Sequence, residues 1–480
     1  MFSLMIWIAA LAIILSGVAY FGGFLQSKGL ITGLAALTIG IGLISYPIGH
    51  HIAQRGAIGG FHQFLNGSIV GTDVDRTTCH EDGSCHQTYN CDPYFVTVVD
   101  SAAYTDKDGN YHPEVSHVET RYHDCPYATE EYTYKVTDSL GGEHTVASHI
   151  FAASPHAWRS GESLPSNVPR GVPKLWQEAQ DGIETNNLYP ITLPSTYDNY
   201  ILADQHTILR ESSDDIEALK KLKLLPDHTH NLHDPFYNQF NADKVSFVGF
   251  TPANAADWQQ ELMYFNAALG MTLRGDLHVV AIKASALPSS VSPRAYLLTL
   301  KAYWLNDLGK YAFAKNGVVL VLGVDDTAST VIWSQASTGM PVGNGTMLAA
   351  LSSLDNTPFT LDALFGSTTA KVVSKDGKTS ASYIPGSGIV PQTMMVEYPF
   401  ARACMECKDK SEASEQGFTY LSTDIPLSGG ALVGTILVDY FLILLMWGAM
   451  VATRKPGDNF GSFSLRPLGG KKDTYDRYEP

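Results

Sequence analysis

Three apolar segments constrain most strongly what this chain can fold into. They span residues 2–25, 29–48 and 431–452, and each is about as long as a helix needs to cross a hydrocarbon core of roughly 30 Å. The sequence therefore predicts three transmembrane helices, two near the N-terminus and one near the C-terminus. An alternative interpretation treats the first segment as a cleaved signal peptide, although that segment lacks a basic start.

Basic residues predict an orientation for these segments. Lys28 lies in the turn between the first two segments, and Arg454, Lys455 and Lys471 follow the third. Because lysine and arginine favour the cytoplasmic side, residues 454–480 are expected to form a cytoplasmic tail and the bulk of the chain to lie outside. The sequence thus predicts a multi-pass plasma-membrane protein that has the lipid bilayer as one partner.

All six cysteines lie between the second and third apolar segments: Cys79, Cys85, Cys91, Cys125, Cys404 and Cys407. An even number of cysteines outside the cytoplasm favours disulfide bonds. Short spacing favours the pairs Cys79–Cys85 and Cys404–Cys407, whereas Cys91 and Cys125 are placed to join neighbouring strands. An alternative interpretation has Cys79, Cys85 and Cys91 bind zinc together with adjacent histidines.

The chain between the apolar segments is predicted to form two extracytoplasmic domains. Residues 56–190 are expected to be β-rich, because four stretches mix aromatic with β-branched residues between turns: 94–99, 115–122, 131–136 and 143–150. Residues 191–400 are expected to form an α/β domain with its core at 246–365. The remaining segments are a transmembrane hairpin, a juxtamembrane segment, a transmembrane helix and the tail: 1–55, 401–430, 431–453 and 454–480.

The α/β core is predicted from alternating strand and helix patterns. Trp258, Leu262 and Phe265 fall on one face of a helix, and two apolar runs at 276–284 and 317–324 are typical of strands covered on both faces. A helix that begins at Pro293 separates these runs. A strand, a helix and a strand at this spacing favour a parallel crossover.

Part of this core resembles the TPM domain family. The resemblance rests on residues 279–282, the following amphipathic helix, residues 316–320, Asp325–Asp326 and Thr338–Gly339. It implies an α/β sandwich on the outer face of a membrane, beside an anchor. The fold class expected for the whole chain is therefore an α+β membrane protein with three transmembrane helices, a cysteine-containing β-rich ectodomain and a TPM-like ectodomain.

Asp325 and Asp326 are the candidate catalytic and metal-binding residues. They follow the predicted strand 317–324, and ligands of open α/β sheets bind just beyond such strand ends. Two adjacent carboxylates suit a divalent cation, calcium or magnesium, or general acid–base catalysis. Some TPM relatives are described as phosphatases, so the resemblance permits metal-dependent phosphate hydrolysis. The alternative interpretation is a solvated turn between two strands.

Asp439 is a polar candidate of another kind, because it lies within the third apolar segment. A carboxylate at that depth of a membrane is costly unless it is neutral or has a partner. Ser45 and Tyr46 of the second segment are placed to reach it. The sequence leaves open a functional role or a hydrogen bond between helices.

These features favour a binding or accessory protein whose TPM-like domain docks on another membrane or envelope protein. The alternative hypothesis is a metal-dependent phosphatase that uses Asp325 and Asp326. The formal net charge of −16 at pH 7 makes nucleic acid an unsuitable partner. The sequence contains no Gly-x-Ser-x-Gly elbow, phosphate-binding loop or dinucleotide fingerprint.

Overall fold

A computed structural model of the chain describes residues 14, 28–79, 88–151, 156–157, 170–203, 216–227, 244–306, 313–339, 343–375, 378–402, 421, 425 and 429–452. The chain divides into two compact units. One comprises Met1–Gly59 with Ser422–Pro480, and the other comprises Gly60–Leu421. Except for residues 56–59, both predicted ectodomains fall in the second unit, and their boundary at residues 190 and 191 stays a prediction.

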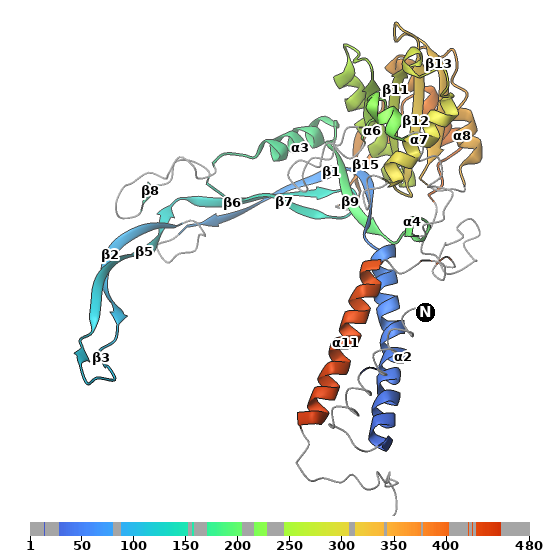
Figure 1. Cartoon of the computed structure of the whole chain (residues 1–480). Helices are drawn as coiled ribbons and strands as arrows, with labels where there is room; N and C mark the ends of the chain where they lie inside the picture. Colours follow the sequence, from blue (N-terminus) through green and yellow to red (C-terminus); the bar gives the residue numbers. More distant parts are fainter. Residues whose placement is uncertain are drawn as a thin grey trace, which may run out of the picture. The chain divides into compact units, whose positions relative to one another are not determined.

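The first unit contains two long helices that pack against each other, α2 (Lys28–Ile58) and α11 (Gly429–Ala452) (Figure 1). α2 contains Pro47, a residue that removes one backbone hydrogen bond from a helix. Both helices expose large apolar side chains, among them Ile44 on α2 and Phe441 on α11. Asp439 and Ile443 of α11 are fully buried.

Within the described residues, no helix combines the length and the apolar content that crossing a membrane requires. The predicted spans 29–48 and 431–452 are therefore wrong, and so are the membrane fold class and the multi-pass plasma-membrane location. Both segments are nevertheless helical, since 29–48 lies within α2 and 431–452 lies within α11. α2 continues past the apolar stretch through His50, His51 and Arg55, and α11 carries a carboxylate. The span 2–25, except Ile14, and the tail 454–480 lie outside the described residues.

In the second unit, a four-stranded antiparallel sheet has the order β7-β6-β1-β9. Its strands are β1 (Phe61–Thr78), β6 (Glu130–Asp138), β7 (Glu143–Phe151) and β9 (Pro190–Tyr197). The N-terminal half of β1 pairs with β9 and its C-terminal half pairs with β6. Helix α3 (Lys174–Thr185) contributes Ala179 to a small core with Ile69, Val136 and Ile191.

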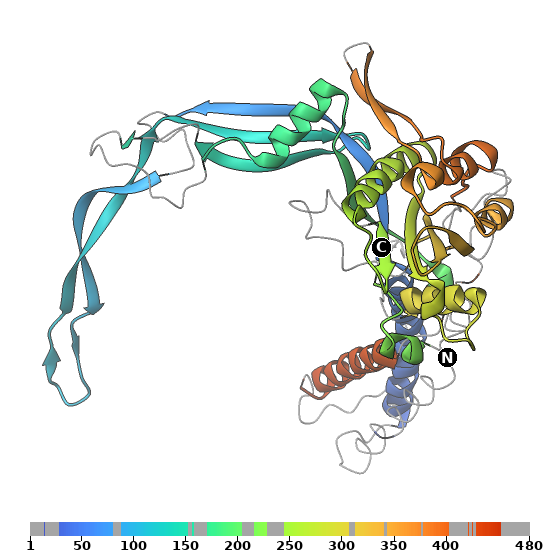
Figure 2. The same cartoon turned by 90° about the horizontal axis from the view of Figure 1, so that it is seen from above.

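Two further strands, β2 (Thr88–Ser101) and β5 (Val115–Ala128), form a long antiparallel ribbon. Among the described residues, only Tyr127 and Ala128 of β5 pair with a third strand, β8 (His156–Ala157). β3 (Tyr104–Thr105) pairs with β4 (Tyr111–His112) at the tip. In both Figure 1 and Figure 2, β2 and β5 can be followed side by side along the ribbon. The strands predicted at 94–99, 115–122, 131–136 and 143–150 are confirmed as parts of β2, β5, β6 and β7.

A second four-stranded sheet has the order β10-β11-β12-β13. β10 (Val245–Val248), β11 (Asp276–Lys283) and β12 (Gly317–Val324) are parallel, and β13 (Val331–Thr338) is antiparallel to β12. Every residue of β12 is buried, as expected for a strand between two covered faces.

Helices cover both faces of this sheet. α7 (Pro293–Asn306) packs on one face, where Trp304 lies in the same apolar cluster as Val319 and Val321. α6 (Ala255–Leu273) and α8 (Gly345–Leu351) pack on the other face, where Trp258 lies in a cluster with Leu320. The helices predicted around Trp258 and from Pro293 are therefore confirmed.

Short elements complete the second unit: α4 (Tyr200–Ala203), α5 (Ile216–Lys221), η3 (Ala284–Ala286), α9 (Leu361–Leu364), β14 (Thr369–Lys375), β15 (Lys378–Ile384), α10 (Ile389–Pro391) and η5 (Gln392–Glu397). The two four-stranded sheets meet through α6. A Cβ placed on Gly270 of α6 would lie 2.5 Å from the backbone oxygen of Asn66 in β1, so a glycine permits this approach.

Candidate functional sites

The predicted acidic pair lies in the turn that connects β12 to β13. Asp325 Oδ1 accepts hydrogen bonds from the backbone N–H groups of Ser329 (2.7 Å) and Thr330 (3.2 Å). Its Oδ2 accepts from the hydroxyls of Thr327 (2.7 Å) and Ser329 (2.8 Å). Asp326 is exposed and accepts a hydrogen bond from Ser285. The structure therefore places both residues at the end of β12, with their carboxylates hydrogen-bonded to different partners.

Hydrogen bonds within the turn decide what Asp325 can do. The Thr327 hydroxyl and the Ser329 backbone N–H hold the pKa of Asp325 well below its usual range, so the carboxylate is ionised. Both of its oxygens are engaged by turn donors, whereas a divalent cation needs carboxylate oxygens directed at the ion. β13 runs antiparallel to β12, so the turn is a hairpin connection and not a crevice between parallel strands. This geometry favours the solvated-turn interpretation of the acidic pair, whose catalytic and metal-binding roles stay predictions.

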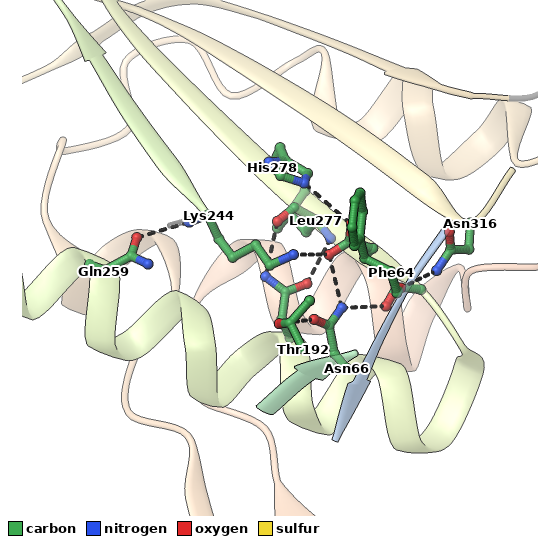
Figure 3. A network of polar contacts seen from close by, with 11 residues as sticks. Phe64, Asn66, Thr192, Lys244, Gln259, Leu277, His278 and Asn316 are labelled. Atoms are coloured by element: carbon green, nitrogen blue, oxygen red, sulfur yellow. Dashed lines mark hydrogen bonds and ion pairs between the residues drawn. The ribbon is translucent and has the colours of Figure 1, made fainter. Parts of the chain in front are cut away.

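A buried ion pair lies at the other end of the same sheet (Figure 3). Lys244, which precedes β10, donates a hydrogen bond of 2.7 Å to Oδ1 of Asp276, the first residue of β11. Asn66 Nδ2 donates to the same oxygen at 2.8 Å, and His278 Nε2 lies 3.3 Å from Oδ2. Exposed fractions of 1% for Lys244 and 2% for Asp276 show that water does not screen the pair.

Further hydrogen bonds extend this cluster, which we call the Asp276 network, between the two four-stranded sheets. Thr192 of β9 donates to Asn66 Oδ1 at 2.7 Å, and Asn66 also donates to the carbonyl of Gly275. Asn316, just before β12, donates to the carbonyl of Phe64 in β1 at 2.7 Å. These bonds join residues separated by more than a hundred positions, so the network holds the β1–β9 side and the β10–β13 sheet together.

Burial and charge set the protonation states in the Asp276 network. Burial alone would raise the pKa of Asp276, but the Lys244 ammonium and the hydrogen bonds from His278 and Lys244 hold it far below the ordinary value of 3.8. Burial lowers the pKa of His278 below 6.5, although the Asp276 carboxylate opposes that shift. The network therefore contains an ionised carboxylate and a neutral imidazole at neutral pH.

Lowering the pH from 7 to 5 is expected to reduce the free energy of unfolding through His278. The unfolded chain binds a proton on this histidine near its ordinary pKa of 6.5, whereas the folded chain binds it only at lower pH, so stability falls with pH in this window. The free energy of unfolding falls further as the pH drops below about 3.9, because the pKa of Asp276 is also lower in the folded chain than in the unfolded chain.

Urea denaturation at pH 7 and pH 5 checks this expectation. The His278→Gln variant, which has no group that titrates in this window, should lose less stability between the two pH values than the unmodified chain. An equal loss in both proteins would contradict a buried neutral His278.

Sequence patterns did not single out the Asp276 network. Its partners lie far apart along the chain, so no local motif identifies them. The only local clue was a pair of charged residues, Lys244 and Asp276, placed directly before apolar strands. Such residues are also common at exposed strand ends, where they carry no structural role.

The cysteine predictions are partly tested. Cys91 and Cys125 form a disulfide with Cα atoms 5.8 Å apart, which confirms that this pair joins neighbouring strands. Cys79 is also disulfide-bonded, but Cys85, Cys404 and Cys407 lie outside the described residues. Oxidised sulfurs do not serve as thiolate ligands, so the zinc interpretation is wrong for Cys79 and Cys91.

Asp439 remains a buried carboxylate without an assigned role. It is fully buried on α11 in the first unit. The side chains of Ser45 and Tyr46, its predicted partners, lie outside the part of the chain that the structure describes. The hydrogen bond between helices therefore stays a prediction.

Two neighbouring depressions lie along the outer side of α6. One has a volume of about 400 Å³ and includes Glu261 and Thr368, and the other has about 670 Å³ and includes Glu178 and Met263. Both are lined by Asn187 and Tyr264, whose hydroxyl donates to Asn187 at 2.6 Å. Burial raises the pKa of Glu261, which accepts a hydrogen bond from the backbone of Thr368. Neither depression contains Asp325 or Asp326.

The β2–β5 ribbon presents two different faces. Residues directly opposite in an antiparallel ladder share a face, and Phe95 pairs with Thr120, Thr97 with Val118 and Val99 with Ser116. We call this uncharged set the apolar face; its members are Phe95, Thr97, Val99, Ser116, Val118 and Thr120. Phe95 is 73% exposed and Val118 is 65% exposed. No described helix or strand covers this face.

The opposite face of the ribbon, which we call the charged face, carries Val96 and Val98 with His117, Glu119 and Arg121. Arg121 forms an ion pair with Glu119 at 3.1 Å. His117 lies 2.9 Å from the carboxylate of Asp100. The charges of this face thus have partners within the ribbon itself.

Comparison with protein-family models, curated proteins and solved structures gives no match to this chain.

Proposed function

We propose that this chain is a binding or accessory protein that docks on another protein. The observation that supports the proposal most directly is the apolar face of the β2–β5 ribbon. Exposed apolar side chains that gather on one face, with charged residues kept to the other, are typical of a surface that a partner covers. The assignment of residues 246–365 as a TPM-like docking domain is part of the same proposal.

The acidic pair supports this proposal by its geometry. A phosphatase site needs carboxylate oxygens that reach a metal ion and a phosphoryl group. Both carboxylate oxygens of Asp325 accept hydrogen bonds from Thr327 and Ser329 of its own turn. The carboxylate of Asp326 accepts a hydrogen bond from Ser285, outside the turn. Among the described residues, three or more histidine, cysteine, aspartate or glutamate side chains lie within metal-binding distances of one another only at Cys91, Asp92 and Cys125, where both sulfurs are in a disulfide.

The full chain is expected to hydrolyse p-nitrophenyl phosphate no faster than its Asp326→Ala variant in the presence of calcium, magnesium or manganese. Asp326 is the informative position because its removal leaves the hydrogen bonds of Asp325 in place. An Asp355→Ala variant, which changes another exposed aspartate, is the matched control. Metal-dependent turnover that disappears only in Asp326→Ala and Asp325→Ala would establish the phosphatase hypothesis instead.

Docking itself is tested by crosslinking the full chain in its own cells and identifying the protein joined to it by mass spectrometry. A discrete partner that also binds the purified chain supports the proposal. If none of the crosslinked proteins binds the chain after purification, the proposal is contradicted.

A further inference from the structure

We infer that the apolar face of the β2–β5 ribbon is a docking surface of this chain, separate from residues 246–365, and that it receives a protein surface whose apolar strip is bordered by lysine or arginine. This inference rests on the proposed function and adds the location of the contact and the chemistry of the partner. Three observations carry it: the asymmetry of the two faces, the charge of the ribbon and the size of the apolar face.

The asymmetry of the faces indicates that one of them is covered in use. A two-stranded ribbon has no core of its own, so water contacts both of its faces unless something packs on them. The charged face suits this exposure, because its ion pairs lie within the ribbon. The apolar face has only hydroxyl and apolar side chains, and its largest members, Phe95 and Val118, are more than half exposed. Covering them would remove apolar surface from water, which favours association.

The charge of the ribbon selects a basic partner. Between residues 88 and 128 the chain has seven acidic side chains and two basic ones: Asp92, Asp100, Asp106, Asp108, Glu114, Glu119 and Asp124 against Lys107 and Arg121. A partner with lysine or arginine around its apolar strip would be attracted to this surface and oriented on it. A second copy of the chain, with its net charge of −16, would bring like charges together.

The size of the apolar face shows which part of an interface it can form. The face extends over five residues of each strand, from Phe95 to Val99 and from Ser116 to Thr120, which is roughly 17 Å at the usual strand rise. A stable interface buries about 800 Å² on each partner. The apolar face is smaller than that, so it suits the central apolar contact of a larger interface, to which the net acidic charge of the ribbon attracts a basic partner.

The test compares the same substitution on the two faces of the ribbon in the full chain. Val118→Lys changes the apolar face, and Val96→Lys makes the same chemical and charge change on the charged face, where it lies opposite Glu119. A photo-crosslinking residue, p-benzoylphenylalanine, is placed at position 118 or at position 96 in the protein's own cells. The protein joined to it is identified, purified and titrated against each variant at several sodium chloride concentrations.

We expect crosslinks from position 118 and none from position 96, to a protein with a basic surface. Val118→Lys should weaken its binding about tenfold or more, as removal of a central contact does, and Val96→Lys less than twofold. Binding should weaken as salt rises. Crosslinks to a second copy of the chain, equal losses in both variants, or binding insensitive to salt would each overturn the inference. A purified partner that binds equally to both variants would leave the proposed function intact, whereas failure of the captured protein to bind the unmodified chain would contradict both.

Discussion

The Lys244→Met variant is expected to lose about 3 to 5 kcal/mol of free energy of unfolding, because it leaves the carboxylate of Asp276 buried without its cation. The ammonium and the carboxylate lie 2.7 Å apart, and neither residue is more than 2% exposed. Asn66 and His278 would remain as hydrogen-bonding neighbours, but neither carries the charge that holds Asp276 ionised at neutral pH. The substituted protein must therefore protonate Asp276, admit water or open the junction between the sheets.

Two further variants separate the charge from the loss of a long side chain. Lys174→Met removes a lysine that is 89% exposed and should change stability by no more than about 0.5 kcal/mol. Lys244→Met combined with Asp276→Asn removes both charges of the ion pair and should recover a large part of the stability that the single variant loses. Urea denaturation followed by tryptophan fluorescence measures all three. A loss below about 1 kcal/mol in Lys244→Met would show that the ion pair does not stabilise the junction.

The junction also illustrates which parts of the fold the sequence could predict. β11 and β12 are continuous apolar runs because helices cover both faces of their sheet, so their pattern is visible in a short window. β1 was not predicted, because its buried positions include Gln63, Asn66 and Ser68. Asn66 is tolerated there because Asp276 and Thr192 satisfy its amide, and these residues lie 210 and 126 positions away. No local pattern contains such partners.

The candidate sites also differ in whether neighbouring or distant residues determine them. The turn interpretation of Asp325 depended on residues two to five positions away, and the hydrogen bonds from Thr327, Ser329 and Thr330 are all local. The strands that form the ribbon could be predicted from aromatic and β-branched residues. The sequence could not predict which face of the ribbon would be uncovered, because that depends on whether another element of the chain packs on the face. The segments predicted to span a membrane are helical, but no helix among the described residues has the length and apolar content that a membrane span requires.

The ribbon itself is expected to depend on its disulfide. The double variant Cys91→Ala/Cys125→Ala should lower the local stability of β2 and β5 by about 4 kcal/mol, from the entropy of the loop that a separation of 34 residues closes. The packed contacts of Cys79, Tyr127 and Phe151 lie at the base of the ribbon, and most of its other side chains are exposed. Little apolar packing therefore remains to hold the two strands together once the covalent link is removed.

Hydrogen exchange measures this loss strand by strand. Amides of β2 and β5 should exchange about two to three orders of magnitude faster in the double variant, whereas those of β11 and β12 should be unchanged because their core does not involve the ribbon. Unchanged exchange in β2 and β5 would show that strand pairing alone holds the ribbon. The same variant should bind the proposed basic partner more weakly although every residue of the apolar face is intact, because a partner would then have to order the ribbon as it binds.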